Sequence, residues 1–296
     1  MELDDLASRC CSKDRGRGSR ATPAYSARGY AIWSSCLLLI LGGIVVFGAA
    51  CGGGGQRDPA YGTVLTVEQA LAAQPGEPIS VTGAIVATGS GADMQMVLAS
   101  VLLESYPPQA GGAMLPVAGL DSASLVGLSS TVGRPDLSPV TWSDYWLTLH
   151  GVIKNGILEV QGVPQVAEAS SGDLQVRFSP VSEPLTAGGT AVWWAFDIQN
   201  MGAGAADLTF SSGQRADVVL SRDGVEKYRW SADKVFTQAL ETVTVASGEI
   251  LPIVLNDELM VEAGRYDLRA TIVAAVGPDG AEPSLLPELN LTVTVY

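Results

Sequence analysis

The chain has 296 residues, of which 47% are hydrophobic, so it is long enough to bury one large hydrophobic core or two ordinary ones. Six of its 17 Lys+Arg and four of its 31 Asp+Glu precede residue 51, which leaves residues 51–296 with a net charge of −16. A surface this acidic repels phosphate backbones, and we therefore exclude nucleic acid as a partner.

Cysteine and histidine are too scarce for several kinds of site. The four cysteines are Cys10, Cys11, Cys36 and Cys51, and the only histidine is His150. Residues 52–296 therefore form no disulfide and offer no thiolate as a nucleophile or metal ligand, and a poly-His metal centre is excluded. No G-x-S-x-G motif marks a nucleophilic serine. The sequence predicts no enzyme activity, no catalytic residue, no cofactor and no metal.

Residues 31–50 form an uncharged, mostly apolar run that follows the basic segment 1–30. Twenty residues in a helix span about 30 Å, the thickness of a bilayer core. The positive-inside bias places residues 1–30, a cytoplasmic or leader segment, in the cytoplasm. We expect a signal or transmembrane helix at 31–50 and an anchored plasma-membrane protein with residues 52–296 on the extracytoplasmic side.

The apolar run ends in the small residues Gly48-Ala49-Ala50 directly before Cys51, and a Gly-rich tether occupies residues 51–60. This arrangement resembles a bacterial lipobox, which implies cleavage after Ala50 and lipidation of Cys51. Gly48 stands where the lipobox most often has Leu, and the leader is long. An uncleaved signal anchor at residues 31–50 is the alternative, with the same topology.

Residues 61–164 are expected to form the first folded domain. Thr66 and Gln69 have capping-box spacing ahead of good helix formers, and Gln74-Pro75-Gly76 ends that short helix. Apolar alternation and short apolar runs then predict about five strands. One helix and about five strands favour a small OB-like barrel, with an α+β sandwich as the alternative.

The clearest hairpin signal lies at residues 146–160, where Asn155-Gly156 suits a type I′ turn between two alternating strands. His150 is out of phase with the apolar Leu147 on the first of these strands. We therefore expect His150 on the less buried face of its strand, as a surface residue and not as a catalytic base.

The segment Glu104–Gly112 reads E-S-Y-P-P-Q-A-G-G. It resembles the E-S-x-P-P-Q-C-G-G loop of short exported bacterial OB-like domains. Those domains carry cysteines where this chain has Ala99 and Ala110, so the resemblance implies a loop without a disulfide here.

Residues 165–173 have the composition of an interdomain linker, and residues 174–296 are patterned almost entirely as strands. About eight strands are expected, near residues 174–178, 192–198, 208–210, 218–220, 242–245, 250–255, 266–273 and 289–295. Asp223-Gly224 is expected to form a hairpin turn, and spacings of about 8 to 12 residues favour an antiparallel sandwich. Tyr266 is placed where such domains fold a tyrosine hydroxyl back onto nearby backbone.

Four motifs occur in order in this last region: N-x-G at 200–202, FSSGQRADVV at 210–219, YRWSADKVFTQA at 228–239 and G-x-Y-x-L at 264–268. Together they resemble the BsuPI-type intracellular proteinase inhibitor family over about residues 174–295. The resemblance implies an immunoglobulin-like sandwich and inhibition of a serine proteinase. A protein that is anchored facing outward does not meet a cytoplasmic proteinase, so the expected partner is a protein outside the cytoplasm, with a proteinase as the first candidate.

The candidate partner-binding loop, named here the 230–238 segment, has aromatic residues near both ends and small or polar residues between them. Its candidate contact residues are Trp230, Asp233, Lys234, Val235, Phe236, Thr237 and Gln238. The alternative is that Trp230 and Phe236 fill the end of the sandwich as core residues.

Acidic side chains at the predicted hairpin turns are a second candidate site. Asp217, Asp223, Glu226, Asn256, Asp257 and Glu258 have oxygens that suit calcium, but the EF-hand spacing is absent and solvated turn acids are favoured. The sequence as a whole predicts a membrane-anchored extracytoplasmic binding protein with a proteinase-inhibitor-like domain. A non-inhibitory envelope scaffold or assembly lipoprotein is the alternative.

Overall fold

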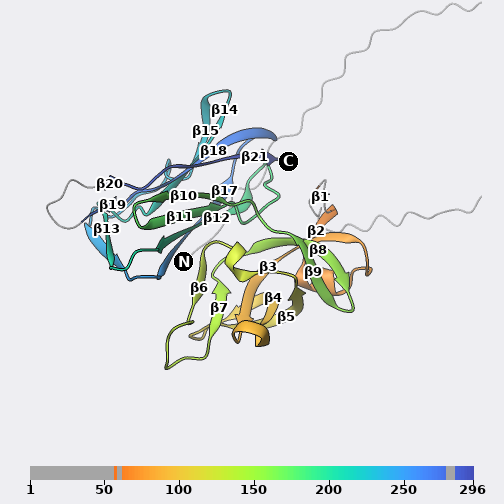
Figure 1. Cartoon of the computed structure of the whole chain (residues 1–296). Coiled ribbons are helices and arrows are strands. Elements are labelled where there is room, and N and C mark those ends of the chain that lie inside the picture. The colour runs from red at the N-terminus through yellow and green to blue at the C-terminus, as the bar shows by residue number, and fades with distance from the viewer. Residues whose placement is uncertain (1–56, 59–61, 278–283) are drawn as a thin grey trace, which may run out of the picture. The chain divides into compact units, whose positions relative to one another are not determined.

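The computed structural model describes residues 57–58, 62–277 and 284–296 (Figure 1). These residues belong to one compact unit, residues 52–296. Strands dominate, which confirms the prediction of a mainly β protein. Cys51 and the predicted segments 1–30 and 31–50 lie outside the described residues. Within the described part of the chain, no helix is long and apolar enough to cross a bilayer.

The first part of the described chain is a small barrel. Its elements are β1 (Arg57–Asp58), β2 (Gly62–Thr66), α1 (Val67–Leu71), β3 (Pro78–Thr88), the 3-10 helix η1 (Gly91–Asp93), β4 (Gln95–Leu103), β5 (Gln109–Ala118), the 3-10 helix η2 (Ser122–Ser124), β6 (Leu128–Ser130), β7 (Val140–Ser143), β8 (Leu147–Lys154) and β9 (Ile157–Gly162). Strands β3, β4, β5, β9 and β8 pair in that order, and β8 pairs back onto β3. The five strands therefore form a closed ring, which does not fit the α+β sandwich alternative. The OB-like assignment of this barrel stays a prediction.

The helix cap near the start of the barrel's sequence and the hairpin turn near its end form as predicted. Thr66 accepts a hydrogen bond from the Gln69 backbone N–H, and the Gln69 side chain accepts one from the Thr66 N–H, which completes the capping box of α1. Between β8 and β9, Asn155 and Gly156 both have positive φ, at 52° and 77°. These angles are the ones that a type I′ turn requires.

The core of the barrel includes residues from both sides of the predicted linker. Its largest fully buried side chains include Tyr145, Ile85 and Leu98, and Val181 and Ala195 belong to the same buried cluster. Apolar packing is therefore continuous across the boundary that the sequence suggested at residues 165–173.

Two segments predicted as linkers are strands. Ala167–Ser171, inside the predicted linker, form β10 and pair antiparallel with β11, the strand that follows. Arg57–Asp58, inside the predicted tether, form β1 and pair with β2. Both segments are polar because they lie at the ends of their sheets. The division of residues 61–296 into two domains stays a prediction.

His150 is buried, with 5% of its surface exposed, and the prediction of a surface residue is wrong. Its Nδ1 lies 2.9 Å from the Ser80 hydroxyl on β3, directly across the ladder. Both faces of β8 are covered, because every residue of the strand except Lys154 is buried. With both faces of β8 buried, the alternation of residues along it no longer separates inside from outside.

The second part of the described chain is an antiparallel β-sandwich. Its strands are β10 (Ala167–Ser171), β11 (Leu174–Ser179), β12 (Thr190–Asn200), β13 (Ala206–Phe210), β14 (Ala216–Arg222), β15 (Val225–Arg229), β16 (Glu241–Val245), β17 (Ile250–Leu259), β18 (Gly264–Ile272), β19 (Ala275–Val276), β20 (Ser284–Leu285) and β21 (Leu289–Val295). They form three sheets, in the orders β10-β11-β12-β17, β15-β14-β18-β21 and β16-β13-β19-β20 (Figure 1). The predicted immunoglobulin-like sandwich is confirmed.

One hydrophobic core joins these sheets. Phe178, Trp194 and Phe196 meet in it, with the Phe178 and Phe196 ring centroids 4.8 Å apart. At the start of β18 the Tyr266 hydroxyl donates to the Glu262 carbonyl at 2.8 Å, the backbone contact that the sequence predicted.

A buried carboxylate lies in the middle of β12. Asp197 is 4% exposed, and its Oδ1 accepts a 2.9 Å hydrogen bond from the Gly127 N–H, which precedes β6. Arg177 Nη1 on β11 lies 3.7 Å from Asp197 Oδ2. Burial raises the pKa of Asp197 to about 6, while the hydrogen bond from Gly127 and the charge of Arg177 act in the opposite direction.

Candidate functional site

The 230–238 segment begins where the β14–β15 hairpin ends. Asp223 and Gly224 form the tight turn of this hairpin with φ of 55° and 73°, as the Asp-Gly pair predicted. The Trp230 N–H then donates to the Val218 carbonyl on β14 at 2.9 Å, which continues the hairpin pairing one residue beyond β15. The start of the segment is therefore fixed by the sheet.

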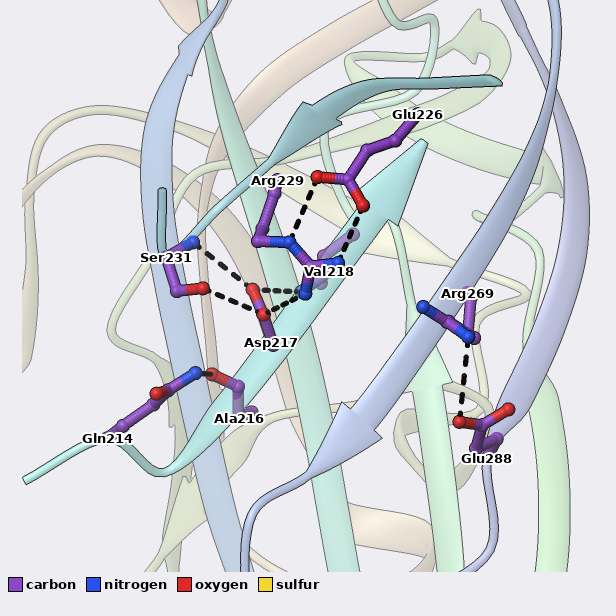
Figure 2. A network of polar contacts seen from close by, with 9 residues as sticks. All are labelled: Gln214, Ala216, Asp217, Val218, Glu226, Arg229, Ser231, Arg269 and Glu288. Atoms are coloured by element: carbon purple, nitrogen blue, oxygen red, sulfur yellow. Dashed lines mark hydrogen bonds and ion pairs between the residues drawn. The ribbon is translucent and has the colours of Figure 1, made fainter. Parts of the chain in front are cut away.

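A buried carboxylate holds the next residue of the segment. Figure 2 shows the Asp217 carboxylate between Arg229 and Ser231. Asp217 Oδ1 accepts from the backbone N–H groups of Val218 and Ser231 at 3.0 and 3.1 Å. Its Oδ2 accepts from Arg229 Nη1 at 2.9 Å and from the Ser231 hydroxyl at 2.8 Å. Four hydrogen bonds satisfy the carboxylate and fix Ser231 to β14.

Arg229 links this buried carboxylate to a surface one. Its Nε and Nη2 donate to the two oxygens of Glu226 at 3.0 and 2.6 Å, a bidentate pair (Figure 2). The hydrogen bonds that Arg229 donates to Glu226 and Asp217 raise the pKa of Arg229, and the same hydrogen bond lowers the pKa of Glu226. The guanidinium thus stays charged and is oriented from both sides.

Trp230 is a core residue at the end of the sandwich. It is 9% exposed, and its indole N–H donates to the Asn256 carbonyl on β17 at 3.0 Å. Phe236 is partly buried on the same core, with its ring centroid 5.8 Å from that of Trp230. The alternative reading of both aromatic residues as core is therefore correct for Trp230 and correct in part for Phe236.

Lys234 is also held in place. Its Nζ lies 3.3 Å from Asp233 Oδ1, 3.3 Å from Asp257 Oδ1 on β17 and 5.0 Å from the Trp230 ring centroid. Asp257 also accepts a 2.9 Å hydrogen bond from the Tyr228 hydroxyl, whose pKa is raised by burial. The Lys234 ammonium is thus directed back onto the sandwich, and only 24% of its side chain is exposed.

The remaining predicted contact residues point outward. Val235 is 99% exposed, and Asp233, Thr237 and Gln238 are also exposed. Residues 234–238 are in neither a helix nor a strand, and burial alternates from residue 233 to residue 237. Residues 233–237 therefore present every second side chain to solvent, as an extended chain does.

The second half of the segment is held by Gly213. The Gly213 N–H donates to the Thr237 carbonyl at 2.9 Å. A Cβ at position 213 would lie 2.6 Å from Thr237 Oγ1, so any side chain there would displace Thr237. This close approach explains the glycine within the FSSGQRADVV motif, whose role the sequence alone did not indicate.

The acidic residues considered for calcium divide between two roles. Asp217 holds the start of the 230–238 segment and Asp257 pairs with Lys234 in its middle, and the prediction that Asp217 is a solvated turn acid is wrong. Asp223 and Glu226 are exposed. Within the described ranges, no group of three or more His, Cys, Asp or Glu side chains is arranged to bind a metal ion.

A cleft of about 690 Å³ lies on the barrel. Val86, Val97 and Val140 line it together with Tyr106, Pro107 and Pro108 of the Glu104–Gly112 loop. The Tyr106 ring is 62% exposed and stands edge-on to the buried Trp142 ring at 6.0 Å. The loop that the sequence singled out thus forms one wall of a mainly apolar cleft.

Residues 181–276 match the family model of BsuPI, described as intracellular proteinase inhibitor. The predicted resemblance is thereby confirmed over a range that contains Gly213, Asp217 and the whole 230–238 segment. One similar solved structure is the CARDB domain of a Pyrococcus furiosus protein in complex with di-metal ions, which is 13% identical, with a TM-score of 0.24, over 45% of this chain and 90% of that chain. A search of curated proteins found no significant match.

Proposed function

We propose that the chain is a membrane-anchored, extracytoplasmic binding protein whose β-sandwich binds a proteinase through the 230–238 segment. One observation carries the proposal. Inside the range that matches a proteinase inhibitor family, a segment that presents alternate side chains to solvent is held at both of its ends by hydrogen bonds. Asp217 holds the first end, and Gly213 holds the second.

This arrangement suits an inhibitor because a proteinase binds its substrate as an extended chain. A free peptide loses conformational entropy when it adopts that shape, at about 0.5 to 1.5 kcal/mol for each immobilised side chain. Trp230, Lys234 and Phe236 are already immobilised on the sandwich. The 230–238 segment therefore binds with less entropy loss than a flexible loop of the same sequence.

The anchored, outward-facing location is supported by the sequence. The apolar run at 31–50, the basic residues before it and the small residues before Cys51 all favour a chain tethered at the membrane surface. The net charge of −16 on residues 51–296 keeps such a domain soluble and away from anionic lipid.

The proposal is tested with the full-length protein in detergent against a panel of secreted serine proteinases, including subtilisin-like enzymes. We expect inhibition of at least one enzyme at stoichiometric concentration. Replacing Lys234, Val235 and Thr237 together by Gly should weaken that inhibition about 100-fold or more, because it removes an interface centre worth a few kcal/mol. Val132→Gly, in an exposed barrel loop, is the control and should leave it unchanged. Proteinase activity that is equal with and without the protein across the panel rejects the proposal.

The cleft on the barrel favours the second candidate, a non-inhibitory envelope scaffold that binds another protein there. Affinity purification from cross-linked membranes distinguishes the two functions. A partner that is lost with Tyr106→Ala but kept by the triple glycine variant of the 230–238 segment supports the scaffold. A partner lost only with the triple variant supports binding through the segment.

A further inference from the structure

Val235 is the most exposed large hydrophobic side chain among the described residues, at 99%, and its two neighbours are both turned inward. Lys234 lies against the Trp230 ring, and Phe236 packs on the sandwich core. An apolar side chain gains nothing from such a position in the isolated chain, because burial of apolar surface is what stabilises it. The fold therefore presents one valine at the centre of an otherwise anchored segment.

The basic residue beside it is not available in the same way. Lys234 Nζ is within 3.3 Å of both Asp233 and Asp257, and its side chain is 24% exposed. A pocket that recognises a basic side chain by a buried carboxylate would have to break both of these ion pairs first. Lys234 is thus a supporting residue, and Val235 is the side chain presented to a partner.

The backbone at Val235 is free to pair with a partner. Among the described residues, neither its N–H nor its carbonyl takes part in a hydrogen bond, whereas the Lys234 N–H donates to Ser231 and the Thr237 carbonyl accepts from Gly213. An extended peptide that binds a proteinase forms main-chain hydrogen bonds with it and places one side chain in a specificity pocket. Val235 has both the free backbone groups and the projecting side chain that this binding mode needs.

We propose that Val235 is the specificity-determining residue of the 230–238 segment, and that the partner is a serine proteinase whose primary pocket is small and apolar. This inference rests on the proposed function and goes beyond it by naming the class of enzyme. Valine is short and β-branched, so a deep slot shaped for an aromatic ring leaves unfilled space around it, and a pocket with a carboxylate at its base leaves that charge unpaired. A shallow apolar pocket matches its size and polarity.

The test measures inhibition constants of the full-length protein against three serine proteinases, whose primary pockets accept small aliphatic, aromatic and basic side chains. The variants are Val235→Gly, Val235→Phe and Val235→Lys, with Val132→Lys as the control in an exposed barrel loop. Since Val235 is 99% exposed, we expect the melting temperatures of its variants to match that of the unmodified protein.

We expect the unmodified protein to bind the enzyme with the small aliphatic pocket most tightly. Val235→Gly should weaken that binding about 10- to 100-fold, because the variant loses the favourable free energy of burying one valine side chain. Val235→Phe should shift the preference toward the enzyme whose pocket accepts aromatic side chains, and Val235→Lys toward the enzyme whose pocket accepts basic side chains. Val132→Lys should change nothing.

Three outcomes decide between the two proposals. A change of preferred enzyme that follows residue 235 supports both of them. Inhibition by the unmodified protein that stays within about threefold in every Val235 variant overturns the role of Val235 and leaves the proposed function standing. No inhibition of any enzyme by the unmodified protein or by any variant overturns both.

Discussion

Replacing Asp197 by asparagine should make the stability of the protein less dependent on pH. The carboxylate is buried on β12, and its pKa is raised to about 6 from the usual 3.8 because burial disfavours the charged form. The folded state therefore holds this proton more tightly than the unfolded chain does. The stability that the protonated group contributes is fully present below about pH 4 and is lost as the pH rises through about 6.

The magnitude follows from the two pKa values. Each pH unit between them corresponds to about 1.4 kcal/mol, so ionisation of Asp197 lowers the free energy of unfolding by about 3 kcal/mol at pH 7. Asparagine stays neutral and still accepts the hydrogen bond from the Gly127 N–H. The charge of Arg177 is already included in this value, because it is one of the influences that set the pKa of Asp197 in the folded state.

The assay is urea unfolding of the unmodified protein and Asp197→Asn at pH 4 to 8. We expect the free energy of unfolding of the variant, relative to the unmodified protein, to rise by about 2 to 3 kcal/mol between pH 4 and pH 7. Arg177→Gln is the companion variant. It removes the charge that lowers the pKa of Asp197, so the pKa of Asp197 rises further. The decrease in the stability of this variant with rising pH should therefore continue to a higher pH than in the unmodified protein. If the free energies of unfolding of Asp197→Asn and of the unmodified protein differ by the same amount at pH 4 and at pH 7, this account of the carboxylate is refuted.

Two further predictions concern the site and the anchor. Asp217→Ala should lower the free energy of unfolding by about 3 kcal/mol in a urea titration, because it leaves the Arg229 and Ser231 donors unpaired. Glu226→Gln should lower it by less than about 1 kcal/mol, because the ion pair between Glu226 and Arg229 is exposed. Metabolic labelling with an alkyne fatty acid should mark the unmodified protein and not Cys51→Ala; label that survives the substitution rejects lipidation, and a chain that is not shortened favours the signal anchor.

The features that could be predicted from sequence are those set by neighbouring residues. The capping box at Thr66 and the turns at Asn155-Gly156 and Asp223-Gly224 depend on contacts within a few residues, and all three form as predicted. The burial of His150 could not be predicted in this way. It depends on contacts with residues far from His150 in the sequence, such as Ser80, whose hydroxyl lies 2.9 Å from His150 Nδ1.

In the candidate site, too, some features could be predicted from neighbouring residues and others depend on residues farther away in the sequence. The position of the 230–238 segment and its aromatic ends could be found from the motifs, because Trp230 and Phe236 stand out in a polar stretch. The two groups that hold the segment could not, because Asp217 and Gly213 belong to a motif about 20 residues earlier. An acidic residue and a glycine between strands are ordinary turn residues by pattern, and only the fold brings them against Ser231 and Thr237.

The hairpin that carries the site also forms the edge of its sheet, with β15 outermost. An open edge can pair with the same edge of another copy, which would join two molecules. Symmetric antiparallel pairing of Val225–Arg229 would place Lys227 of one copy opposite Lys227 of the other, and like charges in that position repel. A β-bulge at Lys227 of β15, opposite Leu220 and Ser221 of β14, also twists this edge. The same hairpin that holds out Val235 to a partner thus resists self-association.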